Sequence, residues 1–236
     1  PTHGLGPVAQ YMNVNRGDRF DYLVSVDSKA AGAHAYGKAK FPADSWQANV
    51  KFKLADWNAS IIKTVGGQTI YLATSMHVPH PYSRINTIQG TKGIFMDYPL
   101  RISFEKEYGD GLGETNFTEE LTQKYRELYK HPMWKQVGEI AKKVGGHGGM
   151  DFIMDLRWVY CLQNGLPLDM DVYDLASWSC ICELTEKSCN ARGKPVDIPD
   201  FTRGAWKTMK PLGIESVDLE KMRFEGIGDI GKQQTV

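Results

Sequence analysis

His3 is the first side chain of this sequence that could move a proton in a reaction. It stands in "PTHGLGPVAQ", ahead of an apolar pattern that predicts a short helix over residues 4–13 with Thr2 as its cap. The positive end of a helix favours the neutral imidazole, which accepts protons near neutral pH. A lone histidine at a helix start is usually a cap or a surface residue, so these residues alone do not make His3 catalytic.

A proline-rich loop carries the next reactive side chains, in "HVPHPYSRINTIQG". His77 and His80 have an H-x-x-H spacing, but two imidazoles need a third ligand to make a metal site. Tyr82 lies between Pro81 and Ser83, where prolines fix the backbone. Because loops held by a scaffold carry function disproportionately, we expect the Tyr82 phenol to enter a pocket.

His147 lies between two glycine pairs in "GGHGGMDF", directly before a predicted helix. Glycines at such a point allow a tight backbone turn or the close approach of a ligand. The alternative is an ordinary helix start, in which His147 occupies the turn and Asp151 the first helical turn. Both interpretations of His147 stay open, whereas for Asp151 the ordinary one is favoured.

Other patterns that suggest chemistry have simpler explanations. Three of the four cysteines lie in "SCICELTEKSC", where no nearby ligand completes a metal set, so we interpret them as buried or idle thiols. "GIGDIG" at 226–231 matches the dinucleotide fingerprint, but the five residues after it cannot form the required helix, which indicates a flexible tail. The sequence has no G-x-S-x-G motif, no P-loop and no evident glycosidase carboxylate pair.

The composition is that of an ordinary globular chain without net charge. Among 236 residues, Lys plus Arg and Asp plus Glu both number 28, so a nucleic-acid partner is not expected, although a local basic patch is not excluded. No apolar run approaches the ~18 residues that cross a bilayer, so no membrane partner is expected.

Strand patterns come first in the sequence and helix patterns later. Short connections such as Gly66-Gly67 fit antiparallel neighbours, because parallel strands need long crossovers. We expect strands at 19–28, 59–65, 68–76, 83–90, 93–98 and 100–106, and helices at 118–130, 133–144, 150–165 and 171–193. Residues 29–57 are ambiguous.

This order predicts an α+β fold: an open, mostly antiparallel sheet with helices packed on one face. We expect one domain over residues 1–236, with a core over about 1–209 and an irregular tail over 210–236. In the strand at 19–28, alternation places Phe20, Tyr22, Val24 and Val26 on one face.

Four segments together resemble a known family. "PTHGLGPVAQYMNVNRGDRFDYLVS", "HPYSRINTIQGTKGIF", "GGHGGMDF" and "VDIPDFTRGAW" are similar to the NAD-dependent α-N-acetylgalactosaminidases, glycoside hydrolase family 109, a branch of the Gfo/Idh/MocA oxidoreductases. In that family a Rossmann domain precedes these motifs, and a tyrosine stands directly before Pro-Thr-His. The resemblance therefore implies the C-terminal, substrate-side domain of a longer enzyme, with the N-terminal Rossmann domain absent from this chain.

The resemblance also implies a site. Pro1, Thr2 and His3 would lie at the sugar, with His3 as the proton-transfer residue and Tyr82 as a second catalytic contact. His147 is a further substrate-binding candidate. The parent would hold NAD mainly in its N-terminal domain, so this chain is expected to bind neither cofactor nor metal and to be inactive alone.

The implied chemistry on a sugar or glycoside is oxidation at C3, elimination at C1, water addition and re-reduction, which needs no carboxylate pair. One alternative is the same domain of an NAD(P)-dependent sugar or inositol dehydrogenase. Another is a non-catalytic carbohydrate-binding or structural domain. The exact sugar, the anomer, the aglycone and the compartment, periplasm or cytoplasm, stay open.

The predicted sheet has a second apolar face. In the strand at 68–76, Ile70 and Leu72 lie on one face, and Tyr71 and Ala73 on the other. Apolar side chains on both faces predict that the open face is buried in a homodimer, as is common in the superfamily that the chain resembles.

Overall fold

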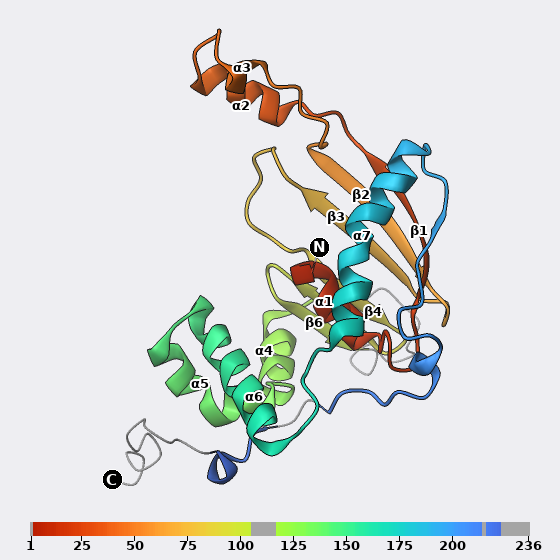
Figure 1. Ribbon diagram of the computed structural model, residues 1–236. Coiled ribbons are helices and arrows are strands. Elements are labelled where there is room, and N and C mark those ends of the chain that lie inside the picture. Colours follow the sequence, from red (N-terminus) through yellow and green to blue (C-terminus); the bar gives the residue numbers. More distant parts are fainter. Residues whose placement is uncertain (1, 105–116, 214–215, 223–236) are drawn as a thin grey trace. The chain divides into compact units, whose positions relative to one another are not determined.

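The computed structural model describes residues 2–104, 117–213 and 216–222, which group into two compact units (Figure 1). Unit 1 comprises the described residues within Pro1–Asn116 and Val172–Pro211, and unit 2 those within Phe117–Asp171 and Leu212–Val236. Unit 2 is therefore inserted into the sequence of unit 1. The single domain expected over 1–236 stays a prediction, and the "GIGDIG" motif lies outside the described residues.

Unit 1 contains the predicted strands and the helices that cover one of their sheets. Its helices are α1 (Thr2–Tyr11), α2 (Gly32–Lys40), α3 (Trp46–Asn49) and α7 (Val172–Asn190), with a 3₁₀ turn at Ala205–Lys207. Its strands are β1 (Phe20–Asp27), β2 (Trp57–Thr64), β3 (Thr69–Ser75), β4 (Asn86–Gly90), β5 (Gly93–Asp97), β6 (Arg101–Phe104) and β7 (Val196–Asp197).

The strands pair in two antiparallel sheets, with the orders β3-β2-β1-β7 and β4-β5-β6. The predicted α+β class with antiparallel strands is thus confirmed, and the described strands divide between two hydrogen-bonded sheets. The short connections from β2 to β3 and from β4 to β5 follow from the glycine-containing turns between them.

One detail of β1 corrects the predicted pattern. Tyr22 and Val26 are exposed on the open face of the sheet, but Phe20 is buried in the core. The pairing register of β1 with β2 shifts between Phe20 and Tyr22, and such an irregularity turns the preceding side chain to the other face. The placement of Phe20 on the same face as Tyr22, Val24 and Val26 is therefore wrong.

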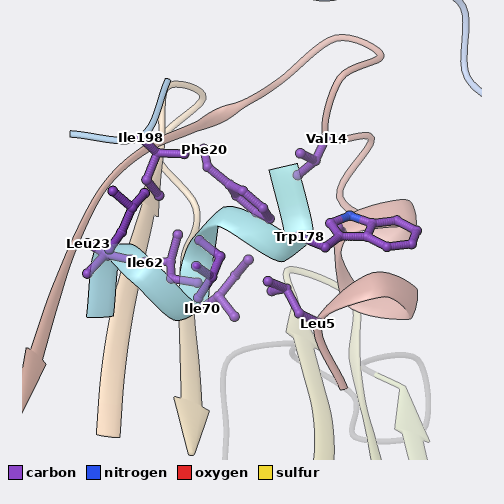
Figure 2. Packing of buried hydrophobic residues seen from close by; sticks show 11 residues of the cluster. Leu5, Val14, Phe20, Leu23, Ile62, Ile70, Trp178 and Ile198 are labelled. Atoms are coloured by element: carbon purple, nitrogen blue, oxygen red, sulfur yellow. The ribbon is translucent and has the colours of Figure 1, made fainter. Parts of the chain in front are cut away.

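The core of unit 1 lies between one face of the β1–β3 sheet and helices α1 and α7 (Figure 2). Leu23 and Ile62 from the strands are fully buried there with Trp178 and Ile181 from α7. Each such side chain stabilises the fold by about 1.5–3 kcal/mol relative to exposure. Helix α1 approaches α7 closely at Gly6, where a Cβ would lie 3.1 Å from the Trp178 ring.

A buried ion pair joins the turn between α1 and β1 to α7. The Arg16 guanidinium donates two hydrogen bonds of 2.7 Å to the Asp174 carboxylate, and the two side chains are only 5% and 1% exposed. The Asn15 amide donates to the same carboxylate at 3.2 Å and to the Ser177 hydroxyl at 3.2 Å. This network ties α1, which carries His3, to α7.

The ambiguous segment folds into a helical arm, residues 28–56, between β1 and β2. Figure 1 shows α2 and α3 beyond the ends of these two strands. The helices pack closely, since a Cβ at Gly37 would lie 2.6 Å from the Gln47 carbonyl oxygen. The Ser45 hydroxyl accepts the Ala48 N–H and so begins α3. Periodicity misses helices of nine and four residues because neither forms a continuous apolar stripe.

Unit 2 is helical in its described residues. Its elements are α4 (Glu119–Leu128), α5 (Pro132–Val144), α6 (Met150–Asn164) and 3₁₀ turns at His147–Gly149 and Leu219–Lys221. As predicted, the Thr118 side chain caps α4, and Gly165 ends α6 with a φ of 61°. None of the helices in the described ranges combines the length and hydropathy of a membrane span.

The first part of the predicted irregular tail packs against these helices. Val217 and Met222 are buried in one cluster with Met133 and Val137 of α5. The Gln136 side chain donates to the Val217 carbonyl oxygen and accepts its N–H, at 2.5 and 3.2 Å. Residues 216–222 thus belong to the core of unit 2.

Replacing Asp174 with alanine should lower the free energy of unfolding by about 3–5 kcal/mol, because the buried Arg16 charge loses its partner. Denaturant titration followed by circular dichroism measures this loss. Asp44 is exposed and makes no hydrogen bond or ion pair among the described residues, so Asp44→Ala should change the free energy by less than about 0.5 kcal/mol. Equal effects of the two variants would contradict a stabilising role of the pair.

Candidate functional site

His3 lies in the first turn of α1 with its side chain exposed. The opposite side of the helix buries Leu5 and Ala9 in the core, so the backbone that carries His3 is anchored while the imidazole meets solvent. The helix begins at Thr2, two residues before the predicted start, and Thr2 is a helical residue rather than the cap. Pro1 lies outside the described residues.

Tyr82 lies on the loop 76–85 between β3 and β4, which we call the Tyr82 loop. The phenol is 73% exposed, and its oxygen accepts a hydrogen bond of 3.0 Å from the Arg84 Nε–H. The Tyr98 ring meets the Tyr82 ring edge to face, with 6.0 Å between centroids. Arg84 and Tyr98 therefore orient the predicted site residue.

Sequence reasoning missed both of these neighbours. The spacing of Tyr82 and Arg84 offered a signal, because residues i and i+2 of an extended segment share a side. Tyr98 follows β5, and its contact with the Tyr82 loop depends on the tertiary fold. In the part of the chain that the structure describes, no hydrogen bond or ring contact joins His3 to Tyr82.

His77 packs at the base of the 28–56 arm rather than beside His80. Its Nδ1 lies 3.8 Å from an oxygen of Asp56, whose carboxylate accepts the N–H groups of Gly32 and Ala31 at 2.8–3.0 Å. The Gly32 and then the Ala31 hydrogen bonds hold the pKa of Asp56 below its ordinary value. Among the described residues, no cluster of three or more His, Cys, Asp or Glu side chains could hold a metal ion.

His147 pairs with Asp151 at the start of α6. Its Nδ1 lies 2.9 Å from Asp151 Oδ2, and both side chains are largely exposed. Gly146, Gly148 and Gly149 all have positive φ, which the sharp turn into α6 requires. This geometry is that of the ordinary helix start, and contact of His147 with substrate stays a prediction.

A cavity of about 300 Å³ in unit 2 contains none of the predicted site residues. Its polar lining comprises His131 and the Arg157–Asp169 ion pair, with Nε to Oδ1 at 3.1 Å. Burial is the main cause that lowers the pKa of His131. Its Nδ1 accepts the Met133 N–H and caps α5, so a structural task accounts for this histidine.

The cysteines are free thiols in a mainly structural setting. Cys161 is fully buried, and burial raises the pKa of Cys180 to about 11. Cys189 contacts the Ser25 hydroxyl and the Asn58 amide. Burial raises the pKa of Cys161 and Cys180 and makes these two thiols poor nucleophiles, whereas Cys182 is exposed.

Unit 1 thus carries an exposed imidazole on α1 and an oriented phenol on the Tyr82 loop, each of a type suited to proton transfer, and that they share one site stays a prediction. The apo form of levoglucosan dehydrogenase is similar in structure, with a TM-score of 0.50 and 17% identity over 83% of this chain and 49% of that one. At this identity the similarity concerns the fold alone, an α+β arrangement of antiparallel strands and helices.

Residues 1–208 match the family model for the C-terminal domain of glycosyl hydrolase family 109, and the chain belongs to this family. A "glycosyl hydrolase family 109 protein" from Shewanella baltica is 53% identical over 215 residues, covering 91% of this chain and 46% of the relative. An "alpha-N-acetylgalactosaminidase" from Shewanella oneidensis is 52% identical over 214 residues, with the same coverage. The chain spans about half the length of these curated relatives.

Acid should loosen the base of the 28–56 arm. Because the pKa of Asp56 is lowered in the folded state, its stabilising contribution is complete above the ordinary value of about 4 and is lost as the pH falls through the lowered value. In a ¹H–¹⁵N NMR titration, the amide resonances of Ala31 and Gly32 should shift as Asp56 protonates.

Two variants check the assignment. Asp56→Asn keeps an acceptor oxygen but has no titrating charge, so the shifts should vanish. Asp27 is a nearby exposed carboxylate, and Asp27→Asn should leave them unchanged. Persistence of the shifts in Asp56→Asn would refute the assignment.

Proposed function

We propose that the chain is the substrate-side domain of an α-N-acetylgalactosaminidase-like, NAD-dependent glycosidase. The family match over residues 1–208 carries the proposal, and the Shewanella oneidensis relative bears that enzyme name. The proposal assigns the activity to a protein of the relatives' length, of which this chain spans about half, and holds that the chain alone is inactive. The structural similarity to levoglucosan dehydrogenase, at 17% sequence identity, concerns the fold alone. It therefore does not favour a plain dehydrogenase over a glycosidase.

The substrate-contacting residues in this proposal are Pro1, Thr2, His3, Tyr82 and His147. His3 and Tyr82 are the catalytic pair, supported by their exposure on anchored elements of unit 1. His3 serves as the base for a sugar hydroxyl or as the acid for a leaving group.

Tyr82 acts as a proton donor in this proposal. Its oxygen already accepts the Arg84 Nε–H, so its own hydroxyl proton is free to point to a sugar oxygen. Arg84 therefore sets the direction of the phenol without touching substrate itself.

NAD is held outside this chain. A dinucleotide cradle needs a parallel βαβ unit with a glycine-rich turn, and the described strand ladders are all antiparallel. The residues that the structure describes do not form such a cradle. In the sequence of C3 oxidation, elimination, water addition and re-reduction, we assign to this chain only binding, orientation and proton transfer.

A homodimer through the open face of the β1–β3 sheet is part of the same proposal. Ile61 is 47% exposed and pairs with Val24 on one side and with the 65% exposed Tyr71 on the other. The apolar residues of this open face are Tyr22, Val24, Val26, Trp57, Ala59, Ile61, Tyr71 and Ala73. A patch of this kind on the face opposite the core favours a symmetric partner.

Removing either catalytic side chain should cost the full-length enzyme about 10²–10⁴-fold in kcat on a chromogenic α-N-acetylgalactosaminide, the range for a lost general acid or base. The variants are His3→Ala and Tyr82→Phe. Tyr11→Phe, on the exposed end of α1, is the matched control and should keep its rate. If both site variants keep their turnover, His3 and Tyr82 have no part in the mechanism. Oxidation of the sugar without release of the aglycone would instead identify a dehydrogenase.

Placing a charge on the open face should separate the dimer. Sedimentation equilibrium of the native chain should give a dimer, and Ile61→Asp should give a monomer because the interface would bury an unpaired carboxylate. Val65→Asp, at the exposed turn after β2, should leave the dimer intact. A monomeric native chain would exclude this interface.

A further inference from the structure

The base of the 28–56 arm packs directly against the first residues of the Tyr82 loop. The Met76 N–H donates to the Asp56 carbonyl oxygen at 2.9 Å, and the His77 ring lies 6.4 Å from the Phe52 ring. Gly32 sits so close to His77 that a Cβ would clash with the His77 carbonyl oxygen. The arm and the loop therefore hold a defined position relative to each other.

This contact places the arm within reach of a ligand bound at Tyr82. Tyr82 lies five positions after His77 in the sequence, and a chain of that length spans at most ~17 Å. A glycan whose terminal sugar lies at the phenol can therefore extend its following sugars to the arm. This step rests on the proposed function.

The arm carries a local excess of positive charge on a chain with no net charge. Five exposed lysines lie on it, and none forms an ion pair with a described residue: Lys29, Lys38, Lys40, Lys51 and Lys53. Its acidic residues are the exposed Asp44 and the buried Asp56, whose carboxylate is engaged by backbone N–H groups. The exposed surface of the arm is thus complementary to an anion.

Aromatic side chains lie among these lysines. Trp46 is 73% and Tyr36 61% exposed, and the Tyr36 ring meets the Phe41 ring edge to face with 6.4 Å between centroids. Lys51 and Lys53 flank Phe52, whose N–H donates to His34 Nε2 at 2.9 Å and whose ring meets the His34 ring at 5.4 Å. An aromatic face packs well against the C–H face of a sugar ring, and this scaffold fixes the flanking lysines.

We propose that the 28–56 arm binds the acidic, sulfated or uronic part of an extended glycan substrate, beyond the sugar that is cleaved. Lysines attract the anionic groups, and Trp46 and Tyr36 pack against sugar rings. A nucleic acid would also suit lysines and aromatic side chains, but the arm lies beside the Tyr82 loop of a glycoside hydrolase domain, which favours a glycan.

Isothermal titration calorimetry of the whole 236-residue chain tests this without any turnover. The probe is a chondroitin 6-sulfate hexasaccharide, and the neutral comparison is chitohexaose. The sulfated probe should bind, added salt should weaken it, and chitohexaose should bind at least about tenfold more weakly. The variants Lys51→Gln/Lys53→Gln and Trp46→Ala should each weaken the sulfated probe by about tenfold or more.

The controls separate this proposal from the catalytic one. Lys194→Gln, which removes an exposed lysine elsewhere in unit 1, should not change the affinity. Binding of the sulfated probe by the chain, together with loss of turnover in His3→Ala of the full-length enzyme, supports both proposals. Binding of the probe with full turnover in that variant supports the arm proposal and contradicts the catalytic one. Absence of binding, equal binding of a short DNA duplex, or equal loss in Lys194→Gln would overturn the arm proposal.

Discussion

The buried pair of Arg16 and Asp174 is the interaction on which the site of unit 1 depends. Arg16 and Asp174 are separated by 158 positions in the sequence, yet their two 2.7 Å hydrogen bonds fix the turn after α1 against the first turns of α7. Around this point, Asn15 and Ser177 complete the hydrogen bonding, and Gly6 lets the Trp178 ring approach α1. A buried charge pair tolerates little displacement, so the direction of α1, and with it the position of His3, is tightly constrained.

A second constraint fixes the other catalytic candidate. The Tyr82 loop begins where Met76 and His77 pack against Asp56 and Gly32, and it carries the hydrogen bond from Arg84 to the phenol oxygen. The loop is therefore held by its base and by its own side chains, although it contains no helix or strand. Binding residues often lie on loops of this kind, because a rigid sheet fixes the positions of both loop ends.

Much of the fold followed from local patterns. Alternation located β2 and β3, and the turn residues predicted antiparallel pairs. The caps at Thr118 and Gly165 located the ends of helices. The burial of Phe20 and the helices of the 28–56 arm did not follow, because a register shift and contacts between distant residues decide them.

In the candidate site too, some residues could be predicted from the sequence and others could not. His3 and Tyr82 came from residue type, loop context and family resemblance, whereas the Tyr98 contact and the role of His77 at the arm base exist only in three dimensions. His147 illustrates the opposite case, since its glycine setting explains a turn and a pairing with Asp151 without any ligand.

The insertion of unit 2 into unit 1 has a consequence for synthesis on the ribosome. Strands β1 to β3 leave the exit tunnel long before α7 and β7, yet Leu23 and Ile62 need Trp178, Ile181 and Ile198 to complete their core. The nascent chain must therefore carry an uncovered apolar sheet while more than a hundred further residues are translated. Apolar surface exposed during this interval makes the incomplete chain prone to aggregation.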